Sequence, residues 1–265
     1  MTKQNTVVIT GAGSGIGRAL AVEAARRGYR LILAGRRLAA LEETARLAGH
    51  ADAVCVAADV TTPEGRARIA AAAQDRLDVL INNAGTLSVG RITGMADAAL
   101  ERMVATNLTA PMALTRDLLP ALEAAGGRVV NIGSVFGDIA FPFFAGYSAT
   151  KFGLRGFSDA IRRELSGSGV GVTYVAPRAA RTEAESEFGA LVEPMAMTLD
   201  SADTVARQAW EAIEKGRRES YPKGKERFFV KIQRLLPGLV DKSVGAQARD
   251  PRVLAALDTR PGGTI

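Results

Sequence analysis

The sequence is poor in the side chains that build disulfides and zinc sites. Its 265 residues include one cysteine, Cys55, and one histidine, His50. A single cysteine excludes an intrachain disulfide, and the pair leaves too few nitrogen and sulfur ligands for zinc. Cys55 lies in an apolar run and is expected in a buried strand, whereas His50 lies in a loop pattern and is expected to be solvated. We predict no metal site and no Ser-His-Asp arrangement around His50.

Aromatic residues and long apolar runs are also scarce. Aromatics make up 5% of the chain, although hydrophobic residues make up 47%. Such a composition, rich in Ala and Gly, suits helices packed closely on a sheet. No run approaches the roughly 18 apolar residues of a membrane-crossing helix, and the first residues carry no signal-peptide pattern. We therefore expect a cytoplasmic protein.

Acidic residues are sparse in one late segment. The net charge of the chain is +6, and residues 215–234 alone hold eight Lys/Arg and two Glu, which accounts for the whole excess. Nucleic-acid-binding proteins usually spread basic charge over a face with interleaved aromatics. Because the charge is confined here, we predict no nucleic-acid partner; salt-dependent binding to a nucleic acid would contradict this.

What the sequence does contain is a regular alternation of short apolar strands and helical stretches. Strands are expected at 6–10, 31–34, 53–57, 78–81, 128–132 and 170–175. Continuous apolar strands separated by helices are typical of a parallel sheet covered on both faces. We predict an α/β fold: one doubly wound Rossmann-type domain over 1–222 with about seven strands, then a helical extension over 223–265 that is not an independent domain. Ligands in such folds bind beyond the carboxyl ends of the strands.

A glycine-rich turn follows the first expected strand directly. Glycines let the backbone turn sharply and let a pyrophosphate approach the N–H groups at a helix start. In this strand–turn–helix context we predict a dinucleotide site, with a turn that binds no ligand as the alternative. The turn reads Thr10-Gly11-Ala12-Gly13-Ser14-Gly15-Ile16-Gly17, and the candidate contacts are Thr10, Gly11, Ser14, Gly15, Ile16 and Gly17.

The end of the second strand bears on which dinucleotide binds. An NAD site usually has Asp or Glu there, whereas this chain has Gly35 followed by Arg36 and Arg37. Two guanidinium groups can bind a 2′-phosphate. We therefore favour NADP(H) over NAD(H), with a solvated basic turn as the alternative.

Two further strand ends offer contacts to the same cofactor. Asp59 and Val60 end the third strand, where a carboxylate can accept a hydrogen bond from the adenine amino group. The alternative is a helix start, because Thr62 precedes Pro63 as a helix cap. The fourth strand ends in Asn82-Asn83-Ala84-Gly85, where small side chains let a cofactor lie close to the backbone.

Tyr147 and Lys151 stand four residues apart, so in a helix both project from one face. A nearby ammonium favours the phenolate, which suits proton transfer. Ser134 closes the fifth strand, 13 residues before Tyr147. Asn107 interrupts a helical stretch, where we expect a kink and a freed carbonyl. Each residue alone has an ordinary alternative: a chance helix pair, a capping serine or a surface asparagine.

In their order and spacing, these motifs resemble the short-chain dehydrogenase/reductase family, from about residue 6 to 182. The resemblance implies that Tyr147 is the general acid or base and that Ser134 stabilises the substrate oxygen. It implies that Lys151 lowers the tyrosine pKa and binds ribose, and that Asn107 anchors a water of a proton relay. It also implies hydride transfer between nicotinamide and a carbonyl or alcohol, in a homodimer or homotetramer.

A rival interpretation on the same fold is a non-catalytic NADP(H)-binding sensor or regulator. The complete set of Asn107, Ser134, Tyr147 and Lys151 argues against it. One position departs from the family, which usually has Pro-Gly where this chain has Pro177 and Arg178. The resemblance places Pro177, Arg178 and Thr182 among the cofactor contacts. Our hypothesis is that Arg178 helps bind an anionic group.

Two loops rich in apolar side chains are expected near the substrate. They predict either a pocket for a hydrophobic ketone or alcohol, or a sealed core. A lid over about 178–198 contains Phe188, Leu191, Met195 and Met197, and the loop after Ser134 contains Phe136, Ile139, Phe141, Phe143 and Phe144.

Residues 225–236 have the pattern of a basic amphipathic helix. Apolar residues at 228, 229, 232, 235 and 236 follow helical spacing, and Lys225, Arg227, Lys231 and Arg234 flank them. One interpretation is a helix docked on its own domain or on a second subunit. The other is peripheral contact with an anionic membrane.

Overall fold

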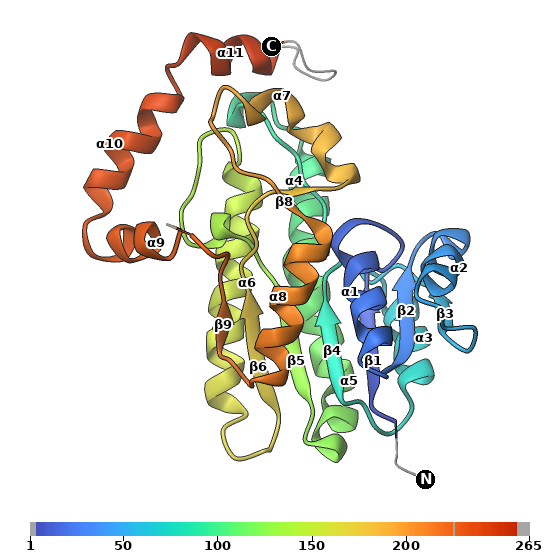
Figure 1. Cartoon of the computed structure of the whole chain (residues 1–265). Coiled ribbons are helices and arrows are strands. Elements are labelled where there is room, and N and C mark those ends of the chain that lie inside the picture. Colours follow the sequence, from blue (N-terminus) through green and yellow to red (C-terminus); the bar gives the residue numbers. More distant parts are fainter. Residues whose placement is uncertain (1–3, 225, 259–265) are drawn as a thin grey trace.

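The computed structural model describes residues 4–224 and 226–258. They form a seven-stranded sheet in the order β3-β2-β1-β4-β5-β6-β9, with helices on both faces (Figure 1). All six strand pairings of this sheet are parallel. The predicted doubly wound α/β fold is therefore confirmed.

Six of the seven strands lie where the sequence predicts them, with each end within one residue of the expected position. The sequence does not predict the seventh strand, β9, because its two residues form no apolar run. Pairing with β6 holds β9 in the sheet. The strands are β1 (Thr6–Thr10), β2 (Arg30–Gly35), β3 (Val54–Ala57), β4 (Val79–Asn82), β5 (Arg128–Ile132), β6 (Gly171–Val175) and β9 (Glu219–Ser220).

Two apolar layers enclose the sheet, because alternate residues of each strand point to opposite faces. Val7 and Ile9 of β1 face one layer with Trp210, whereas Val8 faces the other with Leu114. The first layer contains α1 (Gly15–Arg26) and α8 (Ala202–Glu214), and the second contains α3 (Pro63–Ala73) and α5 (Ala110–Ala125). The remaining helices of the domain include α2 (Leu38–Leu47), α4 (Asp97–Val104) and α6 (Ala145–Glu164).

The only cysteine and histidine both lie at the edge of the sheet. Cys55 is in a strand, as expected, but it is only partly buried because β3 is an edge strand. His50 is also partly buried, and its Nδ1 lies 3.0 Å from a carboxylate oxygen of Asp52. Within the described part of the chain, no group of three or more His, Cys, Asp and Glu could hold a metal ion.

The lid and the extension form the upper part of the molecule in Figure 1. The lid holds β7 (Ala180–Arg181), the 3-10 turn Glu183–Glu187, α7 (Gly189–Val192) and β8 (Asp200–Ser201). The extension holds α9 (Glu226–Leu235), α10 (Pro237–Gln247) and α11 (Pro251–Asp258). It runs along one side and then across the top, where α11 packs on α7 (Figure 1). Lys225, which the sequence placed in the basic helix, is outside the described residues.

Candidate active site

A cleft of about 640 Å³ lies at the carboxyl edge of the sheet, between the strand ends and the lid. It brings together all the predicted site residues except Thr10 and Asn107, which lie behind its wall. The predicted residues that line it are Gly11, Ser14, Gly15, Ile16, Gly17, Arg36, Arg37, Asp59, Val60, Asn83, Ala84, Gly85, Ser134, Tyr147, Lys151, Pro177, Arg178 and Thr182.

The glycine turn forms one end of the cleft with backbone alone. Gly11 and Gly15 have φ of +64° and +51°, in the left-handed region that favours glycine. A Cβ on Gly17 would lie 2.1 Å from the Gly11 carbonyl oxygen, so no larger residue fits. Ser14 precedes α1 and makes no capping hydrogen bond with its side chain. The first turn of α1 therefore meets the cleft with open N–H groups, which suits an anion.

Thr10 is predicted as a cofactor contact, but it supports this turn from behind and is not among the residues that line the cleft. It is 2% exposed. Its hydroxyl accepts hydrogen bonds from the backbone N–H groups of Asn83 and Ala84, both at 3.0 Å. The Asn83 side-chain amide in turn donates to the Thr10 carbonyl at 2.9 Å. These contacts tie the glycine turn to the end of β4.

Two exposed arginines stand at the end of β2, where no carboxylate is present. Arg37 forms an ion pair with Glu183 of the lid at 3.3 Å, and both side chains are about two-thirds exposed. Arg36 makes no hydrogen bond or ion pair with the described residues, although its charge reaches Asp59. Arg36 is thus the freer cation at this edge.

Asp59 shapes the end of β3 and also lines the cleft. Its Oδ1 accepts hydrogen bonds from the hydroxyl and the N–H of Thr61, and these bonds lower the pKa of the carboxyl. Thr62 caps α3 by accepting from the Gly65 N–H at 3.0 Å, as the sequence predicted.

Asn107 lies in a π-helical turn, Ala105–Thr109, between α4 and α5. This wide turn matches the predicted irregularity. The Asn107 side chain is 1% exposed; it accepts from the Thr86 N–H and donates to the Thr86 carbonyl, both at 2.8 Å. It also donates to the Thr150 hydroxyl at 3.1 Å, and that hydroxyl donates to the Tyr147 carbonyl. Asn107 thereby fixes α6 to the loop after β4 through two threonines that the sequence did not single out.

Ser134, Tyr147 and Lys151 meet at the centre of the cleft. The Ser134 hydroxyl accepts from the Phe136 N–H at 3.1 Å and is hydrogen-bonded to the Tyr147 side chain. Lys151 Nζ donates to the Ile132 carbonyl at 2.9 Å and lies 5.6 Å from the centroid of the Tyr147 ring. A phenol, a second hydroxyl and an ammonium therefore converge on one place.

Burial controls the protonation of this group. It raises the pKa of Tyr147 to about 12, against the smaller opposite effect of the Ser134 hydrogen bond. It also lowers the pKa of Lys151 to about 8. The expected lowering of the tyrosine pKa by Lys151 is thus wrong for the protein alone. Desolvation is the largest influence on the Tyr147 pKa, and the Lys151 ammonium donates to the Ile132 carbonyl. At neutral pH Tyr147 is therefore protonated.

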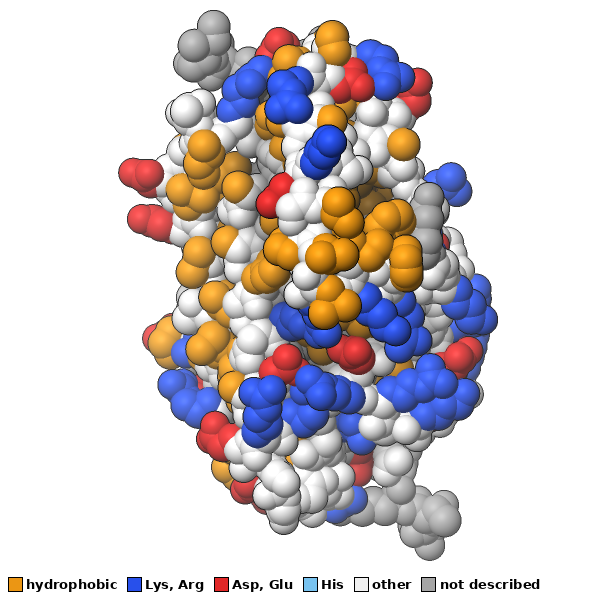
Figure 2. Space-filling view, turned by 90° about the vertical axis from the view of Figure 1, so that its left-hand side faces the viewer, with side chains coloured by type: hydrophobic (Ala, Val, Ile, Leu, Met, Phe, Trp, Pro, Cys, Tyr) orange, Lys and Arg blue, Asp and Glu red, His pale blue; other side chains and the backbone are white. Residues whose placement is uncertain are grey.

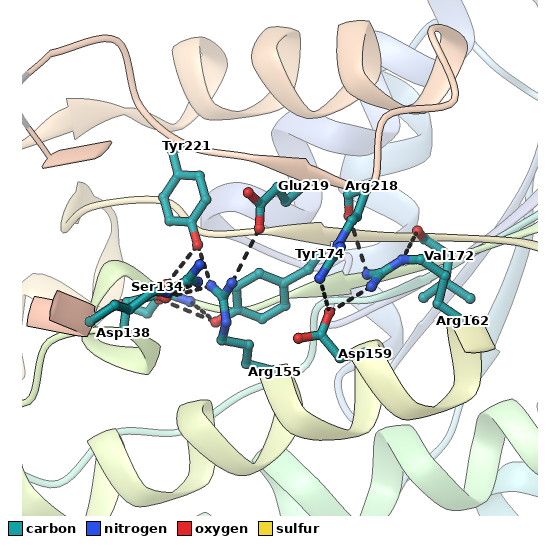
Figure 3. A network of polar contacts seen from close by, with 11 residues as sticks. Ser134, Asp138, Arg155, Asp159, Arg162, Val172, Tyr174, Arg218, Glu219 and Tyr221 are labelled. Carbon is teal, nitrogen blue, oxygen red and sulfur yellow. Dashed lines mark hydrogen bonds and ion pairs between the residues drawn. The ribbon is translucent and has the colours of Figure 1, made fainter. Parts of the chain in front are cut away.

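Tyr174 of β6 braces the loop that carries Ser134 (Figure 3). Its hydroxyl donates to the Ser134 carbonyl at 3.2 Å and lies 3.4 Å from the Ser134 N–H as an acceptor. A Cβ on Gly133 would lie 2.2 Å from the Tyr174 ring, and one on Gly137 would lie 2.4 Å from its hydroxyl. Glycine on both sides of the loop lets the tyrosine approach this closely.

Arg155 holds Tyr174 in place. Its guanidinium lies 5.4 Å from the Tyr174 ring centroid and pairs with Asp138 at 2.5 Å and Glu219 at 3.2 Å (Figure 3). Burial alone would lower the pKa of Arg155. The Tyr221 hydrogen bond and the Asp138 charge outweigh burial and raise this pKa.

Asp138 connects this network to the extension. Its side chain is 2% exposed, accepts from the Tyr221 hydroxyl at 2.9 Å and pairs with Arg234 of α9 at 3.1 Å. Sequence reasoning missed the network, because its members come from separate elements. Its one local clue is that Arg155 follows Lys151 by four residues on the same helix.

Arg178 has partners within the protein. Its guanidinium pairs with Asp200 of β8 at 3.0 Å and with Glu226 of α9 at 2.8 Å, and it donates to the Lys223 carbonyl at 2.7 Å. The anionic groups beside it are therefore carboxylates of the chain itself. Arg178 joins the base of the lid to the start of the extension.

The side chains of the apolar loops are divided between the cleft and the core. Phe136, Phe144, Phe188 and Met197 line the cleft, and the Phe136 ring lies edge-on 6.4 Å from Tyr147. In the apolar cluster around this wall, Phe144, Phe188, Leu191 and Met195 pack with Val253 and Leu257 of α11. One part faces the site, and the other seals it under the extension.

Known proteins that are similar to this chain are dehydrogenases and reductases. A family model described as short chain dehydrogenase matches residues 5–191. Dehydrogenase/reductase SDR family member 7B of Mus musculus is 34% identical over 268 residues, covering 93% of this chain and 82% of that protein.

Two solved structures are similar along most of the chain. A short-chain dehydrogenase from Sphingobium yanoikuyae in complex with NADPH has a TM-score of 0.77 at 31% identity, covering 89% of this chain and 95% of that one. The 3-ketoacyl-(acyl-carrier-protein) reductase from Brucella melitensis complexed with NADH has a TM-score of 0.74 at 26% identity, covering 79% and 90%. Similar folds thus hold either nicotinamide cofactor.

Proposed function

We propose that this chain, which belongs to the short-chain dehydrogenase family, is an NADP(H)-dependent oxidoreductase. It would interconvert a carbonyl and a secondary alcohol. The observation that carries the proposal is the hydrogen-bonded pair of Ser134 and Tyr147 in a cleft with Lys151. The aromatic wall beside the pair supports a hydrophobic substrate.

The cofactor end of the cleft fits a phosphorylated dinucleotide. The open first turn of α1 and the glycine turn would hold the pyrophosphate. Arg36, with Arg37 beside it, would hold a 2′-phosphate, since no carboxylate at the end of β2 opposes it. Gly85 leaves space between Asn107 and Lys151: a Cβ there would lie 3.3 Å from the Asn107 Oδ1. When bound, the nicotinamide supplies or accepts the hydride.

Tyr147 would protonate the substrate oxygen, and Ser134 would stabilise the negative charge that develops on it. With a pKa of about 12, Tyr147 carries a proton that it can give to that oxygen during reduction. The Ser134 hydroxyl can donate to the same oxygen and stabilise its developing negative charge. In oxidation the same proton returns to Tyr147. Lys151, when protonated, would favour the phenolate that remains after the transfer.

We also propose a homodimer or homotetramer. Support comes from Val104, Met112 and Phe152 on α4, α5 and α6, which are 47%, 42% and 41% exposed. These helices pack around the same π-helical turn, so the exposed apolar groups fall on neighbouring elements. Light scattering during gel filtration measures the oligomer directly.

The central experiment is a panel of hydrophobic ketones and secondary alcohols, each tested with NADPH/NADP⁺ and NADH/NAD⁺. Tyr147→Phe is expected to lower kcat/KM by roughly 10²–10⁴ because it removes the transferable proton. NADPH binding should persist, which fluorescence titration measures. Activity that survives this substitution contradicts the mechanism, and NADPH binding without any wild-type turnover favours the sensor alternative.

The cofactor preference is tested by comparing two neighbouring arginines. Arg36→Ala should raise KM for NADPH by about 10- to 100-fold, as loss of a charged hydrogen bond costs ~1.5–3 kcal/mol, and leave KM for NADH nearly unchanged. Arg37→Ala should have a smaller effect, since Arg37 already pairs with Glu183. Arg46→Ala, whose exposed side chain pairs with Glu43, is the control. An unchanged NADPH-to-NADH ratio in Arg36→Ala would refute NADP(H) preference.

A further inference from the structure

The helices α9 and α10 carry an exposed apolar surface that the proposed chemistry does not use. We use the name α9–α10 surface for the exposed apolar and basic side chains of these two helices. Its apolar members are Phe228 (63% exposed), Phe229 (43%), Leu235 (78%), Leu236 (57%) and Leu239 (60%). Its basic members are Arg227, Lys231 and Lys242, all exposed. Figure 2 looks onto this side, where hydrophobic side chains gather at mid-height with Lys and Arg close by.

These apolar groups are not needed to dock the extension. Docking uses the opposite side of the helices, where Val230 and Val240 are 4% and 9% exposed and pack on Ile139. The interpretation of the helix as docked on its own domain is therefore right for one face only. The other face leaves large apolar side chains in water, which is unusual for so many in one short segment.

The charges of the segment divide in the same way. Glu226 and Arg234 form ion pairs with Arg178 and Asp138 of the main domain. Arg227, Lys231 and Lys242 form no ion pair with described residues. Asp241 is the one exposed carboxylate on α9 and α10. What faces solvent is thus apolar and predominantly cationic.

We propose that the α9–α10 surface binds an anionic lipid bilayer at its interface. An amphipathic helix with Phe and Leu on one face and Lys or Arg around them inserts its apolar side at the headgroup boundary, and anionic lipids attract its cations. The binding is peripheral, because among residues 4–224 and 226–258 no helix is long and apolar enough to cross a membrane.

A second copy of the chain is a poorer occupant. A two-fold interface would place the same surface on both subunits and bring Arg227, Lys231 and Lys242 of each copy together. One Asp241 per copy could not offset three cations, and like charges across an interface oppose association. An anionic bilayer instead complements all of them.

The surface also lies close to the apolar part of the cleft. Phe141 packs in two clusters, one with Val230 and Val240 and the other with the aromatic side chains near Phe136. A bilayer on α9 and α10 would place a lipid phase next to the loop that follows Ser134. This step rests on the proposed function and points to lipophilic carbonyl or alcohol substrates, whereas bilayer binding itself does not depend on it.

The test is flotation of the full chain with vesicles of phosphatidylcholine, with or without phosphatidylglycerol. The protein should float with the anionic vesicles at low salt and be largely released at 1 M salt, where the Debye length is about 3 Å. Activity on a water-soluble ketone is measured in parallel, so failure of the proposed function shows separately from failure of vesicle binding.

Paired variants identify the binding surface. Phe228→Ser/Leu235→Ser should weaken the partition onto anionic vesicles at least about tenfold, because both apolar side chains leave the interface. Leu47→Ser, at a leucine 47% exposed at the end of α2, is the matched control and should change nothing. Lys231→Gln/Lys242→Gln should also lose roughly tenfold, with Lys215→Gln as its control. All variants should keep the wild-type melting temperature and soluble-substrate activity.

Three outcomes overturn the proposal. One is the absence of flotation at low salt, and another is flotation that Phe228→Ser/Leu235→Ser leaves unchanged. The third is a concentration-dependent oligomer, seen by light scattering without vesicles, that this double variant dissociates. That last result would assign the surface to a second copy of the chain.

Discussion

The two ends of the cleft are built in different ways. At the glycine turn of the cofactor end, one continuous segment presents backbone groups, and no side chain fits at its closest contact: a Cβ on Gly17 would lie 2.1 Å from the Gly11 carbonyl oxygen. At the catalytic end, Ser134, Tyr147 and Lys151 depend on contacts with residues from distant parts of the chain, including Asn107 and Tyr174.

The difference shows where each end is vulnerable. A site built from backbone fails when atoms are added to it, because packed backbone cannot move aside. A site built from buried polar side chains instead contains groups that cost stability, such as the Lys151 ammonium with its pKa lowered to about 8. Its geometry also fails when a remote brace is removed.

The largest effect should come from crowding the cofactor end. Gly17→Ala places a methyl group about where the Gly11 carbonyl oxygen and the Asn83 amide now lie. We expect a loss of about 3 kcal/mol or more in the free energy of unfolding, and at least a hundredfold rise in Kd for NADPH. Denaturant unfolding and fluorescence titration measure the two.

Gly245→Ala is the matched control for this change. Gly245 lies inside α10, and a Cβ there meets nothing within 4 Å. Alanine should be neutral or stabilise the helix by up to about 1 kcal/mol. If Gly17→Ala behaved like Gly245→Ala, the backbone account of the cofactor end would be wrong.

The second test removes the buried charge from the catalytic end. Lys151→Met should abolish activity yet stabilise the protein without cofactor. A change of one pH unit in a pKa corresponds to about 1.4 kcal/mol. The fall in the Lys151 pKa from 10.5 to about 8 therefore corresponds to a gain of at most about 3 kcal/mol in the free energy of unfolding at neutral pH. The lost bond to the Ile132 carbonyl reduces this gain.

The stability difference between Lys151→Met and wild type should depend on pH. The unfolded chain binds the Lys151 proton more tightly than the folded one, so wild type gains stability as pH rises from about 8 to 10.5. The advantage of Lys151→Met should be greatest below pH 8 and fade across that window, as urea unfolding at several pH values would show. A constant advantage would mean that the charge is not responsible.

The smallest of the three effects should come from the brace behind Ser134. Tyr174→Phe removes the hydroxyl that contacts both the N–H and the carbonyl of Ser134. A slightly displaced Ser134 should lower kcat about tenfold and leave KM for NADPH unchanged. Steady-state kinetics separate the two constants.

Tyr29→Phe, which removes a hydroxyl far from the cleft, is the control for stability and kinetics. A fall in apparent kcat that is matched by an equal fall in the folded fraction of Tyr174→Phe, measured by circular dichroism, would indicate a general loss of folding. In that case Tyr174 would not be a positioning residue for Ser134.

Much of the cleft could be predicted because its residues follow strand ends. A parallel sheet places the carboxyl ends of all its strands along one edge, so Asp59, Asn83 and Ser134 had to converge there. The role of Thr10 was harder to predict. In the sequence it is one more member of the turn, and only the position of β4 shows that its hydroxyl points away from the cleft.

The direction of the Tyr147 pKa could not be read from spacing either. Four residues along a helix place Lys151 near Tyr147, but spacing says nothing about how much water surrounds the two groups. Burial, which depends on the tertiary structure, is the largest influence on the Tyr147 pKa. Arg178 is similar: its carboxylate partners, Asp200 and Glu226, approach it only after the lid and α9 have folded.

The sequence by itself determined the α/β class, the positions of six strands, the glycine turn and the choice of Ser134, Tyr147 and Lys151 as the candidate catalytic residues. Periodicity, turn chemistry and motif spacing are local properties, and local properties can be read along a chain. Only the tertiary structure decided which side chains face the cleft, how burial sets their protonation, and which face of α9 remains exposed. Those features depend on contacts between residues far apart in sequence, such as Asp138 with Arg234.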